Sequence, residues 1–450
     1  MANDQATDFP TFGTDGVRGV ANTELTPAVA QALGRAAAEV LGGTRAVVGR
    51  DPRRSGPMLE AALVAGYLSA GVDVELLGVV PTPTVAHAAA ADDVSGAMIS
   101  ASHNPFADNG IKLFAPGGVK LRDDTEAAIQ ARFHELCARA HVSGPTGSDV
   151  GVTVAGGGAS RWIEAVVDSV PADLGAGLSI VLDCANGAAS ELGPEVFRSL
   201  GADVTVIGAQ PDGININDGV GSTHPASLCA AVTETGADLG LAFDGDADRL
   251  IAVDDRGQVV DGDHILSILA ESWRDAGTLR HDTVVVTVMS NLGFHRAMAA
   301  KGIEVVTTRV GDRYVLEALD DGGFSLGGEQ SGHVICRDLA STGDGVLAGA
   351  QLVAALRRAD RPLSAVAADA MTTVPQILRN VRITGAAAPV VAALGDAVAR
   401  AEAEMGDEGR VLVRPSGTEP LVRVMIEHLD AATAERICDE LVAETQRLVG

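Results

Sequence analysis

Lysine, aromatic side chains and long hydrophobic runs are all scarce in this sequence. Aromatic residues are 3% of the 450 residues, and no stretch reaches the roughly 18 consecutive apolar residues that a membrane-spanning helix requires. The only lysines are Lys112, Lys120 and Lys301, and none lies between Gly and Ser or Thr as in a Walker A loop. These absences argue against a membrane protein and against a P-loop kinase or NTPase.

Paired cysteines and a secretory signal are missing too. Residues 1–9 contain Asp4 and Asp8 but no basic residue, unlike a signal peptide. No CxxC spacing occurs, and an odd number of scattered cysteines indicates reduced thiols rather than disulfides or a zinc ribbon. The five are Cys137, Cys184, Cys229, Cys336 and Cys438. We therefore expect a cytoplasmic protein.

Negative charge is in large excess. The 33 basic and 60 acidic residues give a formal net charge of −27. A field of this sign repels nucleic acids and anionic membrane surfaces, so neither is an expected partner. An anionic small molecule would need a local basic pocket.

Short β-branched runs alternate with Ala- and Leu-rich stretches, and this pattern occurs three times. The first round includes a helix over 26–41, with Thr26 as N-cap, Pro27 at its first position and Gly42 after its end. Such alternation predicts βαβ units and a largely parallel sheet covered on both faces. The expected strands are 45–49, 72–78, 95–101, 178–183, 202–208, 239–244, 283–288, 303–308 and 324–327.

After Pro375 the pattern changes to strands at 377–383, 411–413 and 421–428 with two helical stretches. The expected fold class is α/β, with three similar mixed α/β modules and a C-terminal α+β domain. The predicted domains are 1–150, 151–256, 257–370 and 371–450. The predicted linkers are 143–158, 255–257 and 366–373.

A serine stands at the end of the predicted strand 95–101. Ser102 is followed by His103, Asn104 and Pro105, and the proline keeps Asn104 out of a helix. Open α/β sheets bind ligands at strand ends, so Ser102 is a candidate nucleophile or phosphoryl carrier. A turn-forming serine is the simpler alternative.

Three carboxylates at alternate positions follow the predicted strand 239–244. Asp244, Asp246 and Asp248 can converge on a hard cation such as Mg²⁺, with Arg249 beside them. An EF-hand is excluded, because its sixth position holds Arg249 instead of Gly. A phosphatase with an aspartyl nucleophile and a solvated acidic turn both remain open.

Two further loops have the composition of ligand-binding segments. Gly327–His333 carries Glu329 and Ser331 between glycines at a strand end, which suits contact with a hydroxyl-rich ligand. The stretch 414–423 has the side chains of a phosphate site, because guanidinium groups fit phosphate oxygens and glycine lets amides turn inward. Its candidate residues are Arg414, Ser416, Gly417, Thr418 and Arg423. A Gly-rich hairpin and a capped turn are the alternatives.

Two basic residues are further candidates. Arg18 lies in a Gly-spaced loop over 12–19 that does not match the GxGxxG spacing of dinucleotide-binding sites. Lys112 lies on a short apolar strand close behind Ser102. Lysine can deprotonate when desolvated and arginine effectively cannot, so Lys112 is a candidate proton shuttle, with a surface lysine as the alternative.

Together these motifs resemble those of the α-D-phosphohexomutase family. They span the whole chain in the family's order: FGTDGVRG at 12–19, ISASHNP at 99–105, DGDADR at 244–249, MSNLG at 289–293, GEQSGH at 328–333 and RPSGTEP at 414–420. The resemblance is strongest to the members that act on glucosamine phosphates. It implies four domains around a central cleft.

The resemblance also implies a reaction, the interconversion of glucosamine 6-phosphate and glucosamine 1-phosphate. This reaction feeds UDP-N-acetylglucosamine and cell-wall precursor synthesis. The implied cofactors are one Mg²⁺ per active site and glucosamine 1,6-bisphosphate as intermediate and primer. The implied partners are a sugar phosphate and a second copy of the chain in a homodimer.

Residue roles follow from the same resemblance. Ser102 is the implied phosphoserine, and one of its phosphate oxygens holds Mg²⁺ together with Asp244, Asp246 and Asp248. Glu329 and Ser331 match the sugar-contacting loop, and the five candidates in 414–423 match the clamp on the non-reacting phosphate. The implied catalytic residues are Arg18, Ser102, His103, Lys112, Arg249 and His333.

Three alternatives stay open on the sequence alone. The chain could be a phosphoglucomutase or phosphomannomutase of the same family, which share the serine, metal and clamp motifs. It could be a Mg²⁺-dependent sugar phosphatase that uses Asp244 as nucleophile. It could also be a sugar-phosphate sensor without catalytic activity.

Overall fold

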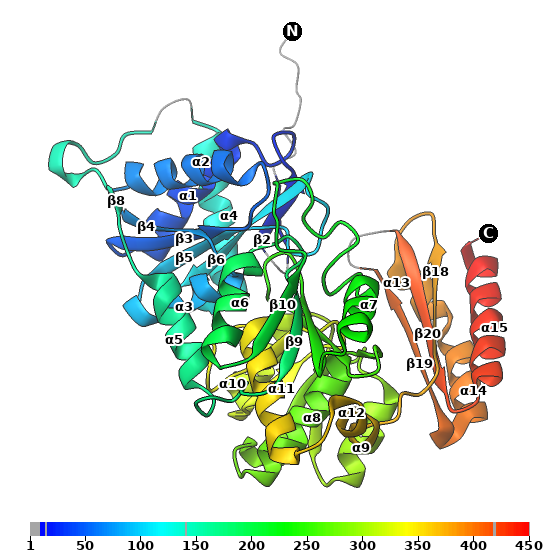
Figure 1. Ribbon diagram of the computed structural model, residues 1–450. Coiled ribbons are helices and arrows are strands. Elements are labelled where there is room, and N and C mark those ends of the chain that lie inside the picture. Colours follow the sequence, from blue (N-terminus) through cyan, green and yellow to red (C-terminus); the bar gives the residue numbers. More distant parts are fainter. Residues whose placement is uncertain (1–9, 14–15, 140–141, 417–419, 450) are drawn as a thin grey trace. The chain divides into compact units, whose positions relative to one another are not determined.

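The computed structural model describes residues 10–13, 16–139, 142–416 and 420–449 (Figure 1). The chain forms two compact units. The first contains Met1–Val288 and Ile303–Ala368, and the second contains Met289–Gly302 and Asp369–Gly450. Within the described ranges, no helix has both the length and the hydropathy needed to cross a membrane.

The first sheet of the larger unit is mixed, and eight of its strands lie in the described residues. Strands β3, β4, β5 and β8 are parallel, whereas β1, β2, β6 and β7 pair antiparallel with their neighbours. The strands are β1 (Phe12–Gly13), β2 (Gly16–Val20), β3 (Arg45–Arg50), β4 (Asp73–Val79), β5 (Ser95–Ile99), β6 (Asp108–Ala115), β7 (Val119–Lys120) and β8 (Thr153–Val154).

Helices cover both faces of this sheet, because its strands are apolar on both sides. One core joins the sheet to α1 (Pro27–Leu41), α2 (Gly56–Ser69) and α4 (Asp123–Cys137). A second core, on the other face, joins it to α3 (Thr82–Asp92) and to Ala159 of α5 (Gly158–Asp168). The α1 prediction is confirmed, since Thr26 accepts a hydrogen bond from the amide of Val29 and Gly42 follows the helix.

Two further sheets repeat the topology of the first. Each has a central strand between two parallel neighbours, and the third strand is followed by an antiparallel one. The second sheet contains β9 (Ser179–Asp183), β10 (Asp203–Ile207), β11 (Leu239–Phe243), β12 (Leu250–Asp254) and β13 (Val259–Val260). The third contains β14 (Thr283–Thr287), β15 (Glu304–Thr308), β16 (Leu326–Gly328) and β17 (Val334–Cys336).

The shared topology places the three candidate loops at equivalent positions. The loop between β5 and β6 holds Ser102, the loop between β11 and β12 holds the three aspartates, and the loop between β16 and β17 holds Glu329. The crossover helices are α6 (Ala189–Ser199), α7 (Ala226–Thr235), α9 (Leu292–Ala300) and α10 (Asp312–Gly322), and α8 (Gly262–Asp275) and α11 (Gly345–Ala359) pack beside them. The predicted three similar α/β modules are confirmed.

The smaller unit is an α+β domain that also holds α9. Its antiparallel sheet has the order β18 (Gln376–Arg382), β20 (Leu421–His428), β19 (Gly409–Pro415). Its further helices are α13 (Ala387–Ala393), α14 (Gly395–Met405) and α15 (Ala431–Val449). Asn291, in the MSNLG motif, donates hydrogen bonds to Val374 O and to the buried Glu427, which ties α9 to this domain.

Several predictions about secondary structure were wrong. The sheet of the first module is mixed rather than largely parallel, and the loop expected at 12–19 contains β1 and β2. The predicted linker 143–158 contains β8, which extends the first sheet, and the linker 366–373 begins inside α12 (Leu363–Ala370). Glycines interrupt the period-2 pattern of β1 and β2 and surround β8, which hides these short strands from a sequence pattern.

Candidate active site

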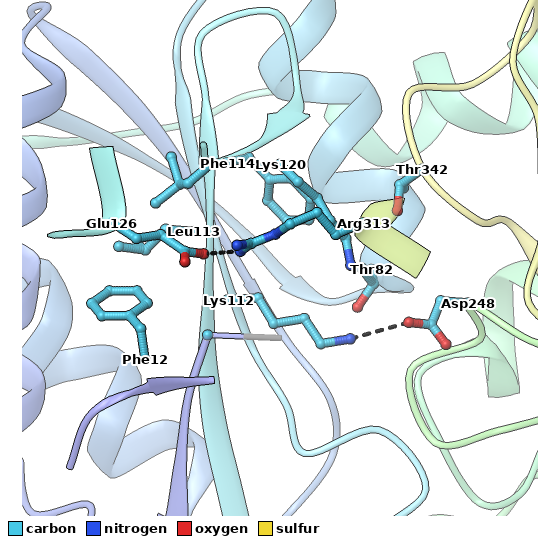
Figure 2. Close-up of a pocket in the computed structure, with 12 residues that line it drawn as sticks. Phe12, Thr82, Lys112, Leu113, Phe114, Lys120, Glu126, Asp248, Arg313 and Thr342 are labelled. Carbon is cyan, nitrogen blue, oxygen red and sulfur yellow. Dashed lines mark hydrogen bonds and ion pairs between the residues drawn. The ribbon is translucent and has the colours of Figure 1, made fainter. Parts of the chain in front are cut away.

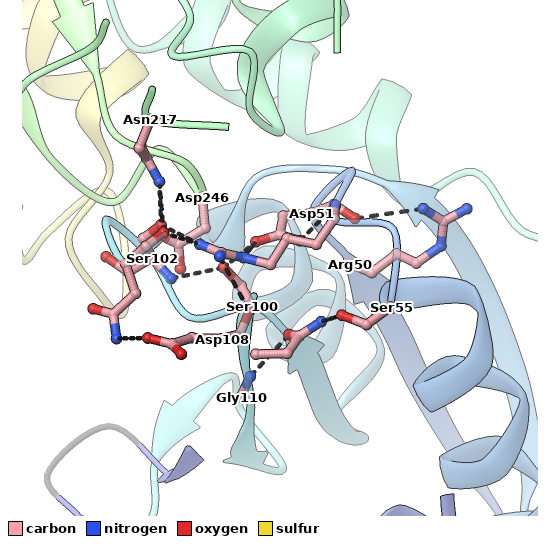
Figure 3. A network of polar contacts seen from close by, with 12 residues as sticks. Arg50, Asp51, Ser55, Ser100, Ser102, Asp108, Gly110, Asn217 and Asp246 are labelled. Carbon is pink, nitrogen blue, oxygen red and sulfur yellow. Dashed lines mark hydrogen bonds and ion pairs between the residues drawn. The ribbon is translucent and has the colours of Figure 1, made fainter. Parts of the chain in front are cut away.

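Ser102 lies at the tip of the first module and is almost fully buried (Figure 3). Its hydroxyl donates a hydrogen bond of 2.6 Å to Asp244 Oδ2, and Nδ1 of His103 lies 3.2 Å from Ser102 Oγ. Its φ of 52° is in the left-handed region, which is unfavourable for a residue with a side chain. Because Asp244 belongs to the second module, its hydrogen bond with Ser102 joins the first and second modules at the candidate phosphoryl carrier.

Gly245 allows this close approach. A Cβ at this position would lie 2.5 Å from Ser102 O and 2.8 Å from Nδ2 of Asn217. The loop that holds the three aspartates accepts backbone hydrogen bonds from all three modules. Thr82 N donates to Asp246 O, Ala188 N to Gly245 O, and Gly345 N to Ala247 O.

The three aspartates converge as predicted. One carboxylate oxygen from each of Asp244, Asp246 and Asp248 lies within 4.8 Å of the others, and all three side chains are buried. Burial and repulsion from Asp248 and Asp246 raise the pKa of Asp244 well above its ordinary value. Asp246 Oδ1 is buried and accepts no hydrogen bond from the described residues. Such an oxygen-only, charge-dense set fits Mg²⁺.

Lys112 faces two of these carboxylates. Its Nζ lies 2.7 Å from Asp246 Oδ2 and 3.1 Å from Asp248 Oδ2, and Thr82 Oγ1 donates to the same Asp246 oxygen. Figure 2 shows Lys112 reaching from β6 toward Asp248 beside a small cavity. Burial alone would raise the pKa of Asp248, but Lys112, His333 and Arg249 hold it well below its ordinary value.

Three basic side chains border the serine and the aspartates. Burial and the charges of Arg249 and Arg18 lower the pKa of His103 to about 4, so its imidazole is neutral at physiological pH. The backbone amide of Arg249 donates to Asp244 Oδ1, and its guanidinium lies 3.9 Å from Asp248. The structure thus brings Arg18, His103 and Arg249 to the same place.

His333 also reaches the metal-site candidate. Its Nδ1 lies 3.8 Å from Asp248 Oδ1, and its Nε2 lies 3.4 Å from Asp312, which is paired with Lys120. Burial disfavours the charged imidazole, but the two aspartates raise the pKa of His333 above its ordinary value. Asp312 and Lys120 were not predicted as site residues, because neither lies in a recognisable motif.

The loop between β16 and β17 carries Glu329 as well as His333. The backbone amide of Glu329 donates a hydrogen bond to His333 O at 3.0 Å. The Glu329 carboxylate accepts from the amide of Gly311 and from the hydroxyl of Ser331, which is exposed. Two oxygen-bearing side chains are therefore held side by side on a rigid turn.

The arginine pair lies in the smaller unit. Arg414 of β19 and Arg423 of β20 are directly opposite in the antiparallel register. Burial and the charge of Arg423 lower the pKa of Arg414, and Arg423 Nε is buried without a hydrogen bond from the described residues. Ser416 N donates to Leu421 O. Gly417 and Thr418 lie outside the described residues.

Two buried residues next to Ser102 were missed by the sequence analysis. Arg53 and Asn217 both donate hydrogen bonds to Ser102 O, at 2.8 and 2.9 Å. Figure 3 shows Asn217 pointing toward Ser102. Arg53 follows β3 within the sequence Asp51-Pro-Arg-Arg-Ser, and charged residues directly after a predicted strand were the available signal.

Comparison with known proteins gives a consistent picture. Models of the phosphoglucomutase/phosphomannomutase α/β/α domains I, II and III match residues 10–139, 160–257 and 261–374. The model of the C-terminal domain of the same proteins matches residues 378–444.

Individual relatives match over nearly the whole chain. The phosphoglucosamine mutase of Rhodococcus jostii is 54% identical over 442 residues, which cover 96% of this chain and 98% of the relative. The crystal structure of a phosphoglucomutase/phosphomannomutase family protein from Burkholderia thailandensis has a TM-score of 0.82 and 27% identity, covering 99% and 98% of the two chains. N-acetylphosphoglucosamine mutase of Aspergillus fumigatus, solved with GlcNAc-6P and magnesium, has a TM-score of 0.70 and 17% identity, covering 99% and 97%.

Replacing Gly245 with Ala is expected to force the serine loop and the aspartate loop apart. We expect a loss of about 1–3 kcal/mol in the free energy of unfolding, as for other overpacked sites. Gly395→Ala is the control, because nothing lies within 4 Å of the added methyl group. Thermal unfolding of the two variants checks this, and equal midpoints would contradict the close approach.

Mg²⁺ is expected to stabilise the protein through the three aspartates. Free Mg²⁺ at 100 times its dissociation constant should add about 2.7 kcal/mol of stability. Asp246→Asn should remove most of that gain, whereas the exposed Asp321→Asn should keep it. Thermal unfolding with and without Mg²⁺ is the measurement, and an unchanged gain in Asp246→Asn would place the ion elsewhere.

Proposed function

The chain belongs to the phosphoglucomutase/phosphomannomutase family, and we propose that it interconverts glucosamine 6-phosphate and glucosamine 1-phosphate through a phosphoserine at Ser102. The single observation that carries the phosphoserine route is the 2.6 Å hydrogen bond from the Ser102 hydroxyl to Asp244. It sets the phosphoryl acceptor beside a site built for a divalent cation.

The proposed cycle uses one hydroxyl as a reversible carrier. Phosphoserine 102 transfers its phosphoryl group to the C1 hydroxyl of glucosamine 6-phosphate, which forms glucosamine 1,6-bisphosphate and frees the serine. The bisphosphate turns over in the site. Ser102 then accepts the C6 phosphoryl group, and glucosamine 1-phosphate leaves.

Positioning and charge neutralisation supply most of the catalysis in such a transfer. Asp244, Asp246 and Asp248 would hold Mg²⁺, which when bound offsets the negative charge of the transferring group. Arg249 and Arg18 add positive charge beside Ser102 and His103.

The attacking sugar hydroxyl must lose its proton. We propose Lys112 as the acceptor, because its side chain is buried and burial favours the neutral amine, the form that can take up a proton. Its two carboxylate partners favour the ammonium form, so the neutral His103 is the second candidate. His333 is proposed to hold Asp248 in place rather than to contact the sugar.

The remaining candidates are proposed to bind the substrate. Glu329 and Ser331 would contact sugar hydroxyl or amino groups, since their oxygens are held on the same turn. The clamp on the non-reacting phosphate would consist of Arg414, Ser416, Gly417, Thr418 and Arg423. Two opposed guanidinium groups favour a doubly charged anion between them.

We propose the domain boundaries 1–150, 151–256, 257–370 and 371–450, supported by the four matched family ranges. We also propose a cytoplasmic location, supported by free thiols at all five cysteines. A homodimer is proposed from the family resemblance, and sedimentation equilibrium would measure the stoichiometry.

Ser102→Ala should abolish mutase turnover, because no other described hydroxyl donates to Asp244. Intact-mass analysis of the wild-type protein should find a fraction with one added phosphate, and the variant should lack it. The assay follows glucosamine 1-phosphate formation after priming with glucosamine 1,6-bisphosphate.

Other outcomes of that experiment identify the alternatives. Phosphate release by Ser102→Ala at the wild-type rate would indicate a phosphatase that uses Asp244. Binding of the sugar phosphate without turnover by the primed wild-type protein would indicate a sensor.

Glu329→Gln should reduce kcat/KM for glucosamine 6-phosphate by about ten- to hundredfold, because a carboxylate bonds to the C2 ammonium more strongly than an amide does. The values for glucose 6-phosphate and mannose 6-phosphate should change much less. The exposed Glu317→Gln is the matched control. Equal losses on all three sugars would contradict a role for Glu329 in recognising the amino group, and a wild-type preference for glucose or mannose would reassign the substrate.

A further inference from the structure

Arg53 is a fully buried arginine that contacts the serine loop only through backbone carbonyls. Its guanidinium donates to the carbonyl oxygens of Ser102 at 2.8 Å, Asn104 at 2.9 Å and Asp108 at 3.1 Å, and also to that of Pro105. Burying a guanidinium is costly unless all its donors are used. This one spans the whole turn between β5 and β6.

Asp51 completes the arrangement from the other side. Its Oδ2 accepts from Arg53 Nε at 2.8 Å and from Ser100 Oγ at 2.7 Å, and Ser100 Oγ accepts from the amide of Ser102 at 2.9 Å. The peptide groups on both sides of the Ser102 Cα are therefore tied to one buried ion pair. Figure 3 shows this network around Asp51, Ser100 and Ser102.

The restraint matters because the loop conformation is strained. Ser102 has a φ of 52°, and such backbone persists only where surrounding contacts impose it. A relaxed φ would swing the side chain away from Asp244. Arg53 itself makes no described hydrogen bond to Asp244, Asp246 or Asp248, the candidate metal ligands.

We propose that the Asp51–Arg53 pair is a positioning device that holds the Ser102 hydroxyl in line for phosphoryl transfer, a role that rests on the proposed function. Arg53 acts through the backbone of the loop and does not touch the substrate. Loss of its geometry should slow transfer to and from Ser102 and leave binding by the Arg414 and Arg423 site unaffected.

The test compares Arg53→Lys with Arg54→Lys. Lysine keeps the charge but cannot donate in the plane of a guanidinium to four carbonyls and a carboxylate. Arg54 is adjacent and exposed, so it is the matched control. Because a misplacement of about 1 Å can cost about a hundredfold in rate, we expect kcat of Arg53→Lys to fall ten- to hundredfold while KM stays within about twofold.

Single-turnover transfer from the phosphorylated enzyme to glucosamine 6-phosphate is the direct readout. It should slow by the same factor in Arg53→Lys and not in Arg54→Lys. Ser100→Ala removes only one hydroxyl and provides a second variant if Arg53→Lys does not fold. It should also lower kcat without raising KM.

Two results would overturn the proposal. One is an unchanged single-turnover rate in a folded variant with a lower unfolding temperature, which would make the pair purely structural. The other is a loss confined to KM. A failure of the proposed function is distinguishable, because the wild-type protein would then show neither phosphorylated Ser102 nor mutase turnover.

Discussion

The hydrogen bond between Ser102 and Asp244 is the contact on which the site of the larger unit depends. It joins loops that are 142 residues apart and that belong to different modules. Neither loop could approach the other with a side chain at position 245. A phosphoryl carrier beside a cation site therefore requires both modules to be folded and docked.

The repeated topology explains how three modules can supply one site. In open α/β sheets, ligands gather at the carboxyl ends of the strands. Each module carries its candidate site residues in the loop after the last of its three neighbouring parallel strands, which are β5, β11 and β16. The first loop supplies a hydroxyl, the second supplies carboxylates, and the third supplies Glu329 and His333. The loop after the central strand supports the loop after the third, as Arg53 does for Ser102 and Ala188 does for Gly245.

The candidate residues for phosphoryl transfer and cation binding could be predicted from the sequence, whereas the residues that hold them in place could not. Ser102 and the aspartates stand directly after long apolar runs, so their strand-end positions follow from local patterns. Arg53 and Asn217 lie 49 and 115 residues from Ser102 in the sequence, and only the folded chain brings them to Ser102 O. No local period encodes such contacts, and each residue alone resembles a surface polar group.

The contacts of α9 show the same limit. The β–α–β pattern of 283–308 predicts this helix within the third module, and the model of family domain III covers the same residues. The buried carboxylate of Glu427 accepts hydrogen bonds from Asn291 and from the amide of Leu292 at the start of the helix, as well as from Arg410. A buried charge needs several partners, and no local pattern predicts that this helix supplies two of them.

Charge is the remaining constraint, because a protein of net charge −27 must hold anions. Long-range attraction cannot recruit a sugar phosphate to such a chain, so affinity has to come from short-range contacts. Like charges directly opposite one another across two strands are destabilising, yet Arg414 and Arg423 hold that arrangement. An anion bound between them, as in the proposed phosphate clamp, would remove the repulsion and gain two forked hydrogen-bond donors, and it would therefore stabilise this sheet.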